Sequence, residues 1–161
     1  MKRMILYLSL LLIVSLLSCN NEIPVDDDEA TFKENVLLLL NAYRSSGCNC
    51  EPGNFYSPAS SFQWNDILEM AAKAHTTDMY SKKFFDHNGS DGSNVGDRIR
   101  LYGYKWTMCA ENIARGYNSE EQVIKAWISS SGHCRNIMNP YFKEIGLSKV
   151  GDYWTLVLGA Q

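Results

Sequence analysis

The stretch Ser129-Ser130-Ser131-Gly132-His133-Cys134-Arg135-Asn136-Ile137-Met138-Asn139-Pro140, followed by Glu144-Ile145-Gly146, decides how this sequence is organised. A helical pattern of apolar residues ends at the three serines, and an alternating strand pattern begins near Glu144. The segment between them is therefore predicted to be a loop that presents His133. Functional side chains concentrate on loops that a rigid scaffold holds in place, so we expect a site here.

Two upstream segments are the candidate partners of this loop. One is Asp86-His87-Asn88-Gly89-Ser90-Asp91-Gly92-Ser93, and the other is Ala110-Glu111-Asn112-Ile113-Ala114. With His133 and Glu144 they supply two imidazoles and two carboxylates. We expect these four side chains to meet in one cleft.

The first 18 residues have the pattern of an export signal. Lys2-Arg3 precedes a thirteen-residue apolar run from Ile5 to Leu17, which is too short to span a bilayer comfortably. The run ends in Leu16-Leu17-Ser18-Cys19, which resembles the bacterial lipobox, so residues 1–18 are predicted to be a lipoprotein signal peptide and Cys19 the lipidated N-terminus. The alternative is a simple cleaved signal that leaves Cys19 unmodified.

Residues 19–30 are predicted to be an acidic tether between a lipid anchor and the folded domain. Without Lys2 and Arg3, the chain from Cys19 has 13 Lys and Arg against 18 Asp and Glu, a net charge of −5, and the tether supplies five of the acids. The remainder has no basic excess to bind phosphates, so nucleic acid is excluded as a partner. The expected location is the cell envelope, on the periplasmic face of an outer membrane or on the cell surface.

Four cysteines lie in the remaining residues 31–161: Cys48, Cys50, Cys109 and Cys134. An even number of cysteines in an exported chain favours disulfides. Cys48 and Cys50 are too close to bridge each other without strain. If all four are paired, each of these two bonds with Cys109 or Cys134, in an order that the sequence leaves open. A four-thiolate metal site is the less favoured alternative, because the paired Cys-x2-Cys spacing of zinc ribbons is missing.

Residues 31–161 are predicted to form one domain with helices on either side of a small antiparallel sheet. Capping and apolar spacing indicate helices that begin at Thr31, Asn65 and Ser119, and a short helix over residues 95–102. Residues 105–114 read as extended, and residues 143–150 and 153–159 as a hairpin turning at Gly151-Asp152. The composition of residues 48–61 supports only a loop.

A set of motifs in this order resembles the CAP superfamily, which includes the cysteine-rich secretory proteins, insect venom antigen 5 and plant pathogenesis-related protein 1. The motifs are Asn41-Ala42-Tyr43-Arg44, Trp64-Asn65, Ala71-Ala72-Lys73-Ala74-His75, Phe84-Phe85-Asp86-His87, Asp91-Gly92-Ser93, Glu111-Asn112-Ile113-Ala114, Gly132-His133-Cys134-Arg135-Asn136-Ile137-Met138 and Glu144-Ile145-Gly146. Bacterial members are the most similar, and the resemblance covers residues 36–158. Departures from the family pattern are Cys109, Ala110 and Ser131, and Cys109 puts the family's disulfide pattern in doubt.

The resemblance implies an α+β fold, a three-layer α-β-α sandwich with the small antiparallel sheet between helical layers. It places His87, Glu111, His133 and Glu144 in the cleft. Two neutral imidazoles and one carboxylate can hold Zn²⁺ or another divalent cation, and the second carboxylate could then act as a general base. Glu111 and Glu144 are thus both candidate metal ligands and candidate catalytic residues. His75 falls on or beside the apolar face of its helix and is interpreted as a partly buried histidine with a structural role rather than a ligand.

The expected function is binding of a small molecule, a lipid, a peptide or a divalent metal in this cleft, by a lipid-anchored protein that is a monomer. The alternative is a metal-dependent hydrolase that acts on peptides or cell-wall material. The sequence does not decide whether the protein is an enzyme, because fold does not fix function.

Overall fold

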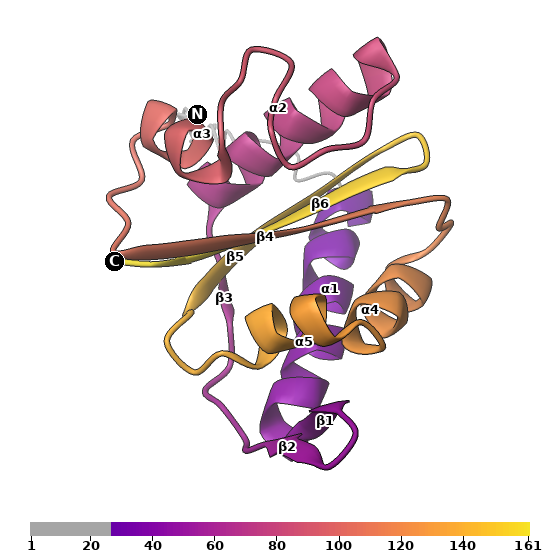
Figure 1. Cartoon of the computed structure of the whole chain (residues 1–161). Helices are drawn as coiled ribbons and strands as arrows, with labels where there is room; N and C mark the ends of the chain where they lie inside the picture. The colour runs from indigo at the N-terminus through magenta and orange to yellow at the C-terminus, as the bar shows by residue number, and fades with distance from the viewer. Residues whose placement is uncertain (1–26) are drawn as a thin grey trace, which may run out of the picture.

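The structure is a computed structural model that describes residues 27–161 (Figure 1). The predicted signal peptide, Cys19 and residues 19–26 of the predicted tether lie outside the described residues. Within residues 27–161, no helix has both the length and the apolar character that a membrane crossing requires.

Three layers make up the domain, and the predicted sandwich is confirmed. Helices α2 (Asp66–Lys82) and α3 (Val95–Leu101) cover one face of the central sheet (Figure 1). Helices α1 (Asp27–Ser46), α4 (Glu120–Ile128) and α5 (Ser131–Met138) cover the other face.

The central sheet has the strand order β3-β5-β6-β4. Strand β6 (Tyr153–Ala160) lies between β4 (Met108–Arg115) and β5 (Glu144–Val150), and it pairs antiparallel with both. Gly151, with a φ of 60°, makes the predicted two-residue turn between β5 and β6. Strand β3 (Gln63–Trp64) pairs in parallel with β5. The predicted antiparallel sheet therefore has one short parallel strand at its edge. The backbone N–H of Asn65 then donates to the carbonyl of Ile145, which fixes the start of α2 over β5.

Every residue of β6 is buried, because both faces of the sheet are covered. On the side of α1, α4 and α5, Trp154, Leu156 and Leu158 belong to the larger core cluster. On the opposite side, Val157 packs with a smaller cluster that includes Leu68 of α2. The central strand is therefore shared by two cores.

The stretch that was predicted to be a loop forms helix α5, so that prediction is wrong. Cys134, Ile137 and Met138 are all buried at helical spacing in the larger core. Burial of this apolar stripe outweighs the local preference of serine, glycine and asparagine for turns. His133 consequently projects from a helix.

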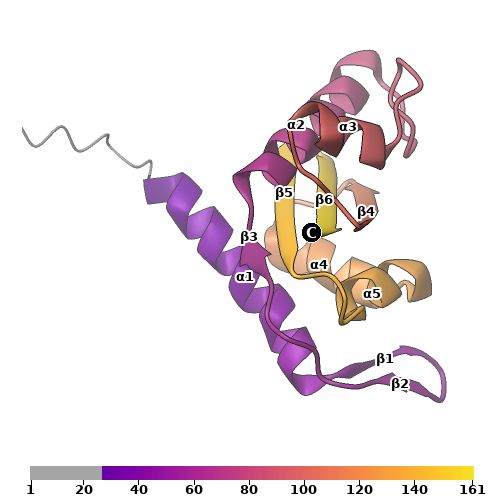
Figure 2. The ribbon, with the colours of Figure 1, turned by 90° about the vertical axis from the view of Figure 1, so that its left-hand side faces the viewer.

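Two other predictions are corrected at the ends of α1. The helix begins at Asp27 rather than Thr31, so residues 27–30 of the predicted tether are helical. Acidic residues suit a helix N-terminus, and Glu29 pairs with Lys33 at 2.9 Å. Residues 48–61, which were predicted to be a loop, contain the hairpin of β1 (Cys48–Glu51) and β2 (Asn54–Tyr56) at the far end of α1 (Figure 2).

Candidate functional site

A buried carboxylate, Glu111 on β4, is the centre of the candidate site. Its Oε1 lies 2.8 Å from Nδ1 of His87, and its Oε2 accepts a hydrogen bond of 2.7 Å from Nη2 of Arg98. Because a carboxylate accepts the hydrogen bond, Nδ1 of His87 must carry the proton. This tautomer leaves Nε2 of the neutral His87 ring as a free acceptor. The carboxylate also raises the pKa of His87 above its usual value.

Arg98 is a site residue that the sequence reasoning missed. It is buried, and its ion pair with Glu111 compensates the cost of burying both charges. Its two terminal nitrogens also donate to the carbonyls of His87, at 3.0 Å, and of Ser93, at 2.7 Å. The available signal was helical spacing, since Arg98 follows Val95 by three positions and therefore lies on the covered face of α3.

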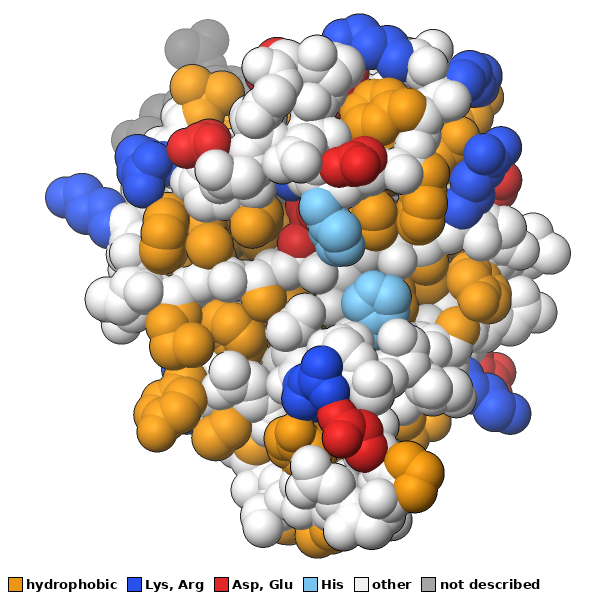
Figure 3. Space-filling model, in the orientation of Figure 1, with side chains coloured by type: hydrophobic (Ala, Val, Ile, Leu, Met, Phe, Trp, Pro, Cys, Tyr) orange, Lys and Arg blue, Asp and Glu red, His pale blue; other side chains and the backbone are white. Residues whose placement is uncertain are grey.

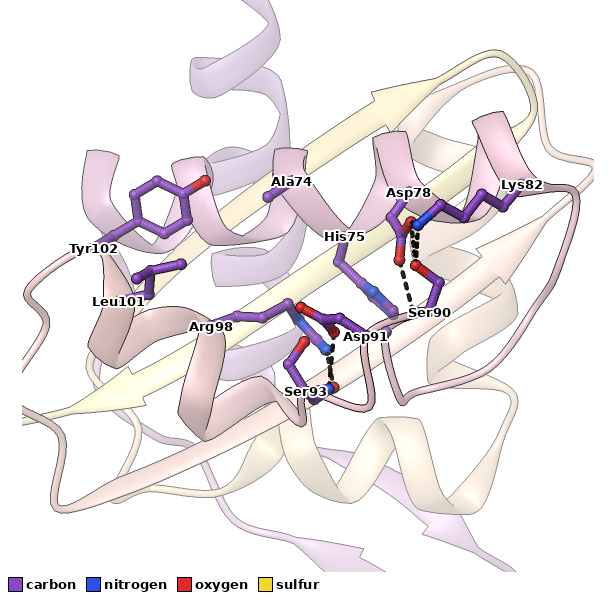
Figure 4. Close-up of a pocket in the computed structure, with 11 residues that line it drawn as sticks. Ala74, His75, Asp78, Lys82, Ser90, Asp91, Ser93, Arg98, Leu101 and Tyr102 are labelled. Carbon is purple, nitrogen blue, oxygen red and sulfur yellow. Dashed lines mark hydrogen bonds and ion pairs between the residues drawn. The ribbon is translucent and has the colours of Figure 1, made fainter.

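The loop that carries His87 is fixed to α2 by its own hydrogen bonds. Asp78 of α2 accepts two hydrogen bonds from Ser90, from the backbone N–H and from the hydroxyl, both of 2.8 Å. A hollow of about 190 Å³ lies between this loop, α2 and α3, and His75 and Arg98 point toward it (Figure 4). Nε2 of His75 donates to the carbonyl of Asp86 at 2.9 Å, in agreement with the structural role predicted for this histidine, and burial lowers its pKa.

His133 is half-buried on α5 and lies across β4 from the loop of His87. Its carbonyl accepts from Nδ2 of Asn112, and Oδ1 of Asn112 accepts from Asn136, so this end of α5 is tied to β4. Burial, followed by the nearby charge of His87, lowers the pKa of His133. On this face of the molecule two histidine side chains lie close together, with acidic atoms beside them and apolar side chains on both flanks (Figure 3).

Glu144 makes its hydrogen bonds with residues other than the three other predicted site residues. The register of the sheet puts it on the same face as Glu111, but on β5, two strands away. Its oxygens accept hydrogen bonds from Asn65, at 2.8 Å, and from the hydroxyl of Tyr104, at 2.6 Å. The structure thus brings His87 into contact with Glu111 and places His133 close enough to His87 for the charge of His87 to affect its pKa. Glu144 has different partners.

The cysteines pair only in part as predicted. Cys50 and Cys134 form a disulfide, with Cα atoms 5.4 Å apart, whereas Cys48 and Cys109 are free thiols. Cys109 packs with the cluster on the α2 and α3 side of the sheet, and Cys48 with the core on the other side. The sheet separates them, so Cys109, which was a candidate for a disulfide if all four cysteines paired, is not bridged. Among residues 27–161, Cys48, Cys50 and Cys134 are the only metal-capable trio whose ligand atoms all lie within 4.8 Å of one another.

The sequence pattern of the cysteine-rich secretory protein family (CAP) matches residues 37–157. The chain belongs to this family. The match runs from the middle of α1 to the middle of β6, and it includes His87, Glu111, His133 and Glu144. The CAP assignment made from the motifs is therefore confirmed.

Several proteins that are similar to this chain are bacterial. The uncharacterized protein YkwD of Bacillus subtilis is 38% identical over 95 residues, which are 58% of this chain and 37% of YkwD. Among solved structures, an extracellular protein containing a SCP domain from Bacillus anthracis has a TM-score of 0.71 at 21% identity, and the match covers 86% of this chain and 45% of that one. An outer surface protein from Borrelia burgdorferi has a TM-score of 0.66 at 18% identity, over 86% of this chain and 96% of that one. The match to this CAP chain thus spans less than half of the length of YkwD.

Proposed function

We propose that this CAP protein is an exported, lipid-anchored binding protein that holds a divalent cation, with a ligand, between His87 and His133. The observation that carries the proposal is the hydrogen bond between Glu111 and Nδ1 of His87. It turns the free Nε2 of His87 into a metal-binding atom with a fixed orientation. The neighbours named as extracellular and outer surface proteins support export.

The donor set suits Zn²⁺ in particular. Histidines that bind zinc usually donate the other ring nitrogen to a carboxylate, which fixes the tautomer and strengthens the ligand. Glu111 has this relation to His87, and the lowered pKa of His133 favours the neutral imidazole, which metal binding requires. Glu111 is therefore a positioning residue rather than a ligand in this proposal. A bound ion would offer its remaining positions to water or to a ligand.

A hollow beside His133 offers a place for the ligand. It has a volume of about 320 Å³, and its walls include Phe85, Ile113, Tyr117 and Trp127. Apolar walls beside a few polar groups are typical of sites for small molecules. A small molecule, a lipid chain or an apolar peptide side chain is the proposed occupant.

We favour binding over hydrolysis because both glutamates are already engaged in holding other side chains in place. Both oxygens of Glu111 and both oxygens of Glu144 already accept hydrogen bonds from protein donors. A general base needs an oxygen within reach of the proton that it removes.

Zinc titration calorimetry of the protein that follows Cys19 tests the metal site. We expect the parent to bind one Zn²⁺, the double variant His87→Ala/His133→Ala to give no binding heat, and Glu111→Gln to bind about 10-fold to 100-fold more weakly. Glu144→Gln is the matched control and should bind like the parent, because Glu144 has other partners. Circular dichroism confirms that each variant is folded. Equal binding heats for the parent and the double variant would contradict the proposal.

Fractionation of cells that express the full chain tests the anchor. We expect the parent to sediment with membranes and Cys19→Ala to appear in the soluble fraction, because the lipid attaches to the Cys19 sulfur. Metabolic labelling with a fatty acid should mark the parent alone. Labelling of Cys19→Ala, or no labelling of the parent, would rule out this anchor without affecting the metal site.

A further inference from the structure

Three sulfur atoms meet where the β1–β2 hairpin joins α5, and one of them belongs to Cys134, the residue after His133. The disulfide between Cys50 and Cys134 is buried, and its two residues are 6% and 0% exposed. Cys48 is a half-buried free thiol whose Sγ lies 3.5 Å from Sγ of Cys134. This is van der Waals contact between a potential nucleophile and one end of a disulfide.

We propose that Cys48, Cys50 and Cys134 form a thiol–disulfide exchange centre, in which Cys134 bonds alternately to Cys50 and to Cys48. The three Sγ atoms all lie within 4.8 Å of one another, so Sγ of Cys48 must first move into line with the Cys50–Cys134 bond. The Cys48 thiolate then attacks Sγ of Cys134, so that the Cys48–Cys134 bond forms as the Cys50–Cys134 bond breaks. The electron pair of the broken bond stays on Sγ of Cys50. That sulfur then takes up a proton in place of the one that Cys48 released, and no oxidant or reductant is consumed.

The local geometry of β1 directs both of its cysteines toward α5. Asn49 between them is exposed, whereas Cys48 and Cys50 are covered, as expected of alternate residues on one side of a strand. The β1–β2 register shifts between Asn49 and Glu51, so the backbone next to Cys50 is irregular. A strand interrupted in this way can adjust to either sulfur with little loss of pairing.

The two pairings constrain the rest of the chain almost equally. Cys50 and Cys134 are 84 residues apart, and Cys48 and Cys134 are 86 apart. Loop entropy varies with the logarithm of loop length, so it does not favour either bond. The local packing of the two sulfurs decides which pairing predominates.

The exchange also gives the buried bond a route to thiols outside the protein. Direct attack on Cys50 or Cys134 is hindered because both are buried. Cys48 is more exposed, and once it is bonded to Cys134 the disulfide includes an accessible sulfur. Low-molecular-weight thiols are the chemical class that should reach the disulfide in this way.

Peptide mapping of the protein that follows Cys19, in a Cys109→Ser background, tests the centre, since Cys109 is otherwise a second free thiol among residues 27–161. The Cys50→Ser variant is expected to form a Cys48–Cys134 disulfide and to melt within a few degrees of the parent. In the parent, alkylation followed by proteolysis should find the label mainly on Cys48 and in a minor fraction on Cys50. Fragmentation between the two residues is needed to locate the label, because one tryptic peptide contains both.

Reduction kinetics provide a second readout that does not depend on Cys50→Ser. We expect dithiothreitol to reduce the disulfide of Cys48→Ser about tenfold more slowly than that of the parent, because the accessible sulfur is lost. The proposal is overturned if the two rates are equal and the label in the parent is confined to Cys48. It is likewise overturned if folded Cys50→Ser keeps two free thiols under glutathione oxidation.

Discussion

Gly146→Ala is expected to lower the free energy of unfolding by at least about 3 kcal/mol, or to prevent folding. A Cβ atom at this position would lie 2.0 Å from the backbone nitrogen of Glu69 and 2.3 Å from the carbonyl carbon of Leu68. Both are backbone atoms of the first turns of α2, so no side-chain rotation relieves the clash. The whole helix would have to move away from β5 and open the core that contains Leu68.

Urea unfolding followed by tryptophan fluorescence measures this effect, because Trp127 and Trp154 are buried in the larger core. Gly132→Ala in α5 is the matched control, since a Cβ there meets nothing closer than an Arg135 nitrogen at 4.0 Å. We expect that variant to be within about 1 kcal/mol of the parent and, if different, more stable. An unchanged unfolding midpoint for Gly146→Ala would show that α2 and β5 are not in such close contact.

Arg44→Ala is expected to cost about 3–5 kcal/mol, because Arg44 is a buried cation that joins three parts of the chain. The residue is 0% exposed, and its guanidinium lies 3.9 Å from the ring centre of Phe62. It donates hydrogen bonds of 2.6–3.1 Å to the carbonyls of Ser60, Ile137, Asn139 and Phe142. Burial lowers its pKa to about 10, so it stays charged at neutral pH.

Removing Arg44 would leave these carbonyls without their donor and would loosen the connection between α5 and β5. Arg44→Lys should recover only a small part of the loss, because one ammonium cannot reproduce the planar geometry of the guanidinium. Arg100→Ala is the control, with an exposed side chain and an expected change within about 0.5 kcal/mol. Urea unfolding measures both variants. If Arg44→Ala loses no more free energy of unfolding than Arg100→Ala, water replaces the Arg44 guanidinium at no cost.

Regular patterns and local capping chemistry made much of the fold predictable. The side chain of Asn65 accepts hydrogen bonds from Ile67 and Leu68 at the start of α2, as its position indicated. The alternating pattern on both sides of Gly151 predicted the hairpin of β5 and β6. Helix α5 was missed because its stability comes from the burial of Cys134 and Ile137, and contacts of this kind are not local in sequence.

The candidate site was predictable to the extent that motifs carry it. The contact of His87 with Glu111 followed from the family resemblance, because the two residues are 24 positions apart. The partners of the two glutamates were not evident from the sequence. Arg98 reaches Glu111, and Tyr104 reaches Glu144, only because α3 folds over the sheet. Likewise, an even number of cysteines suggested complete pairing, but the sheet holds Cys109 away from the others.

If Cys19 carries a lipid, as proposed, helix α1 sets the distance of the β1–β2 hairpin from the bilayer. Seven residues separate Cys19 from Asp27, and even a fully extended chain of that length reaches only about 25 Å. From Asp27 the helix continues for 20 residues, or about 30 Å, to the β1–β2 hairpin at its other end (Figure 2). A lipid on Cys19 would thus keep the start of α1 within about 25 Å of the headgroups, and with α1 upright the three sulfurs would lie at the end of the helix away from the bilayer.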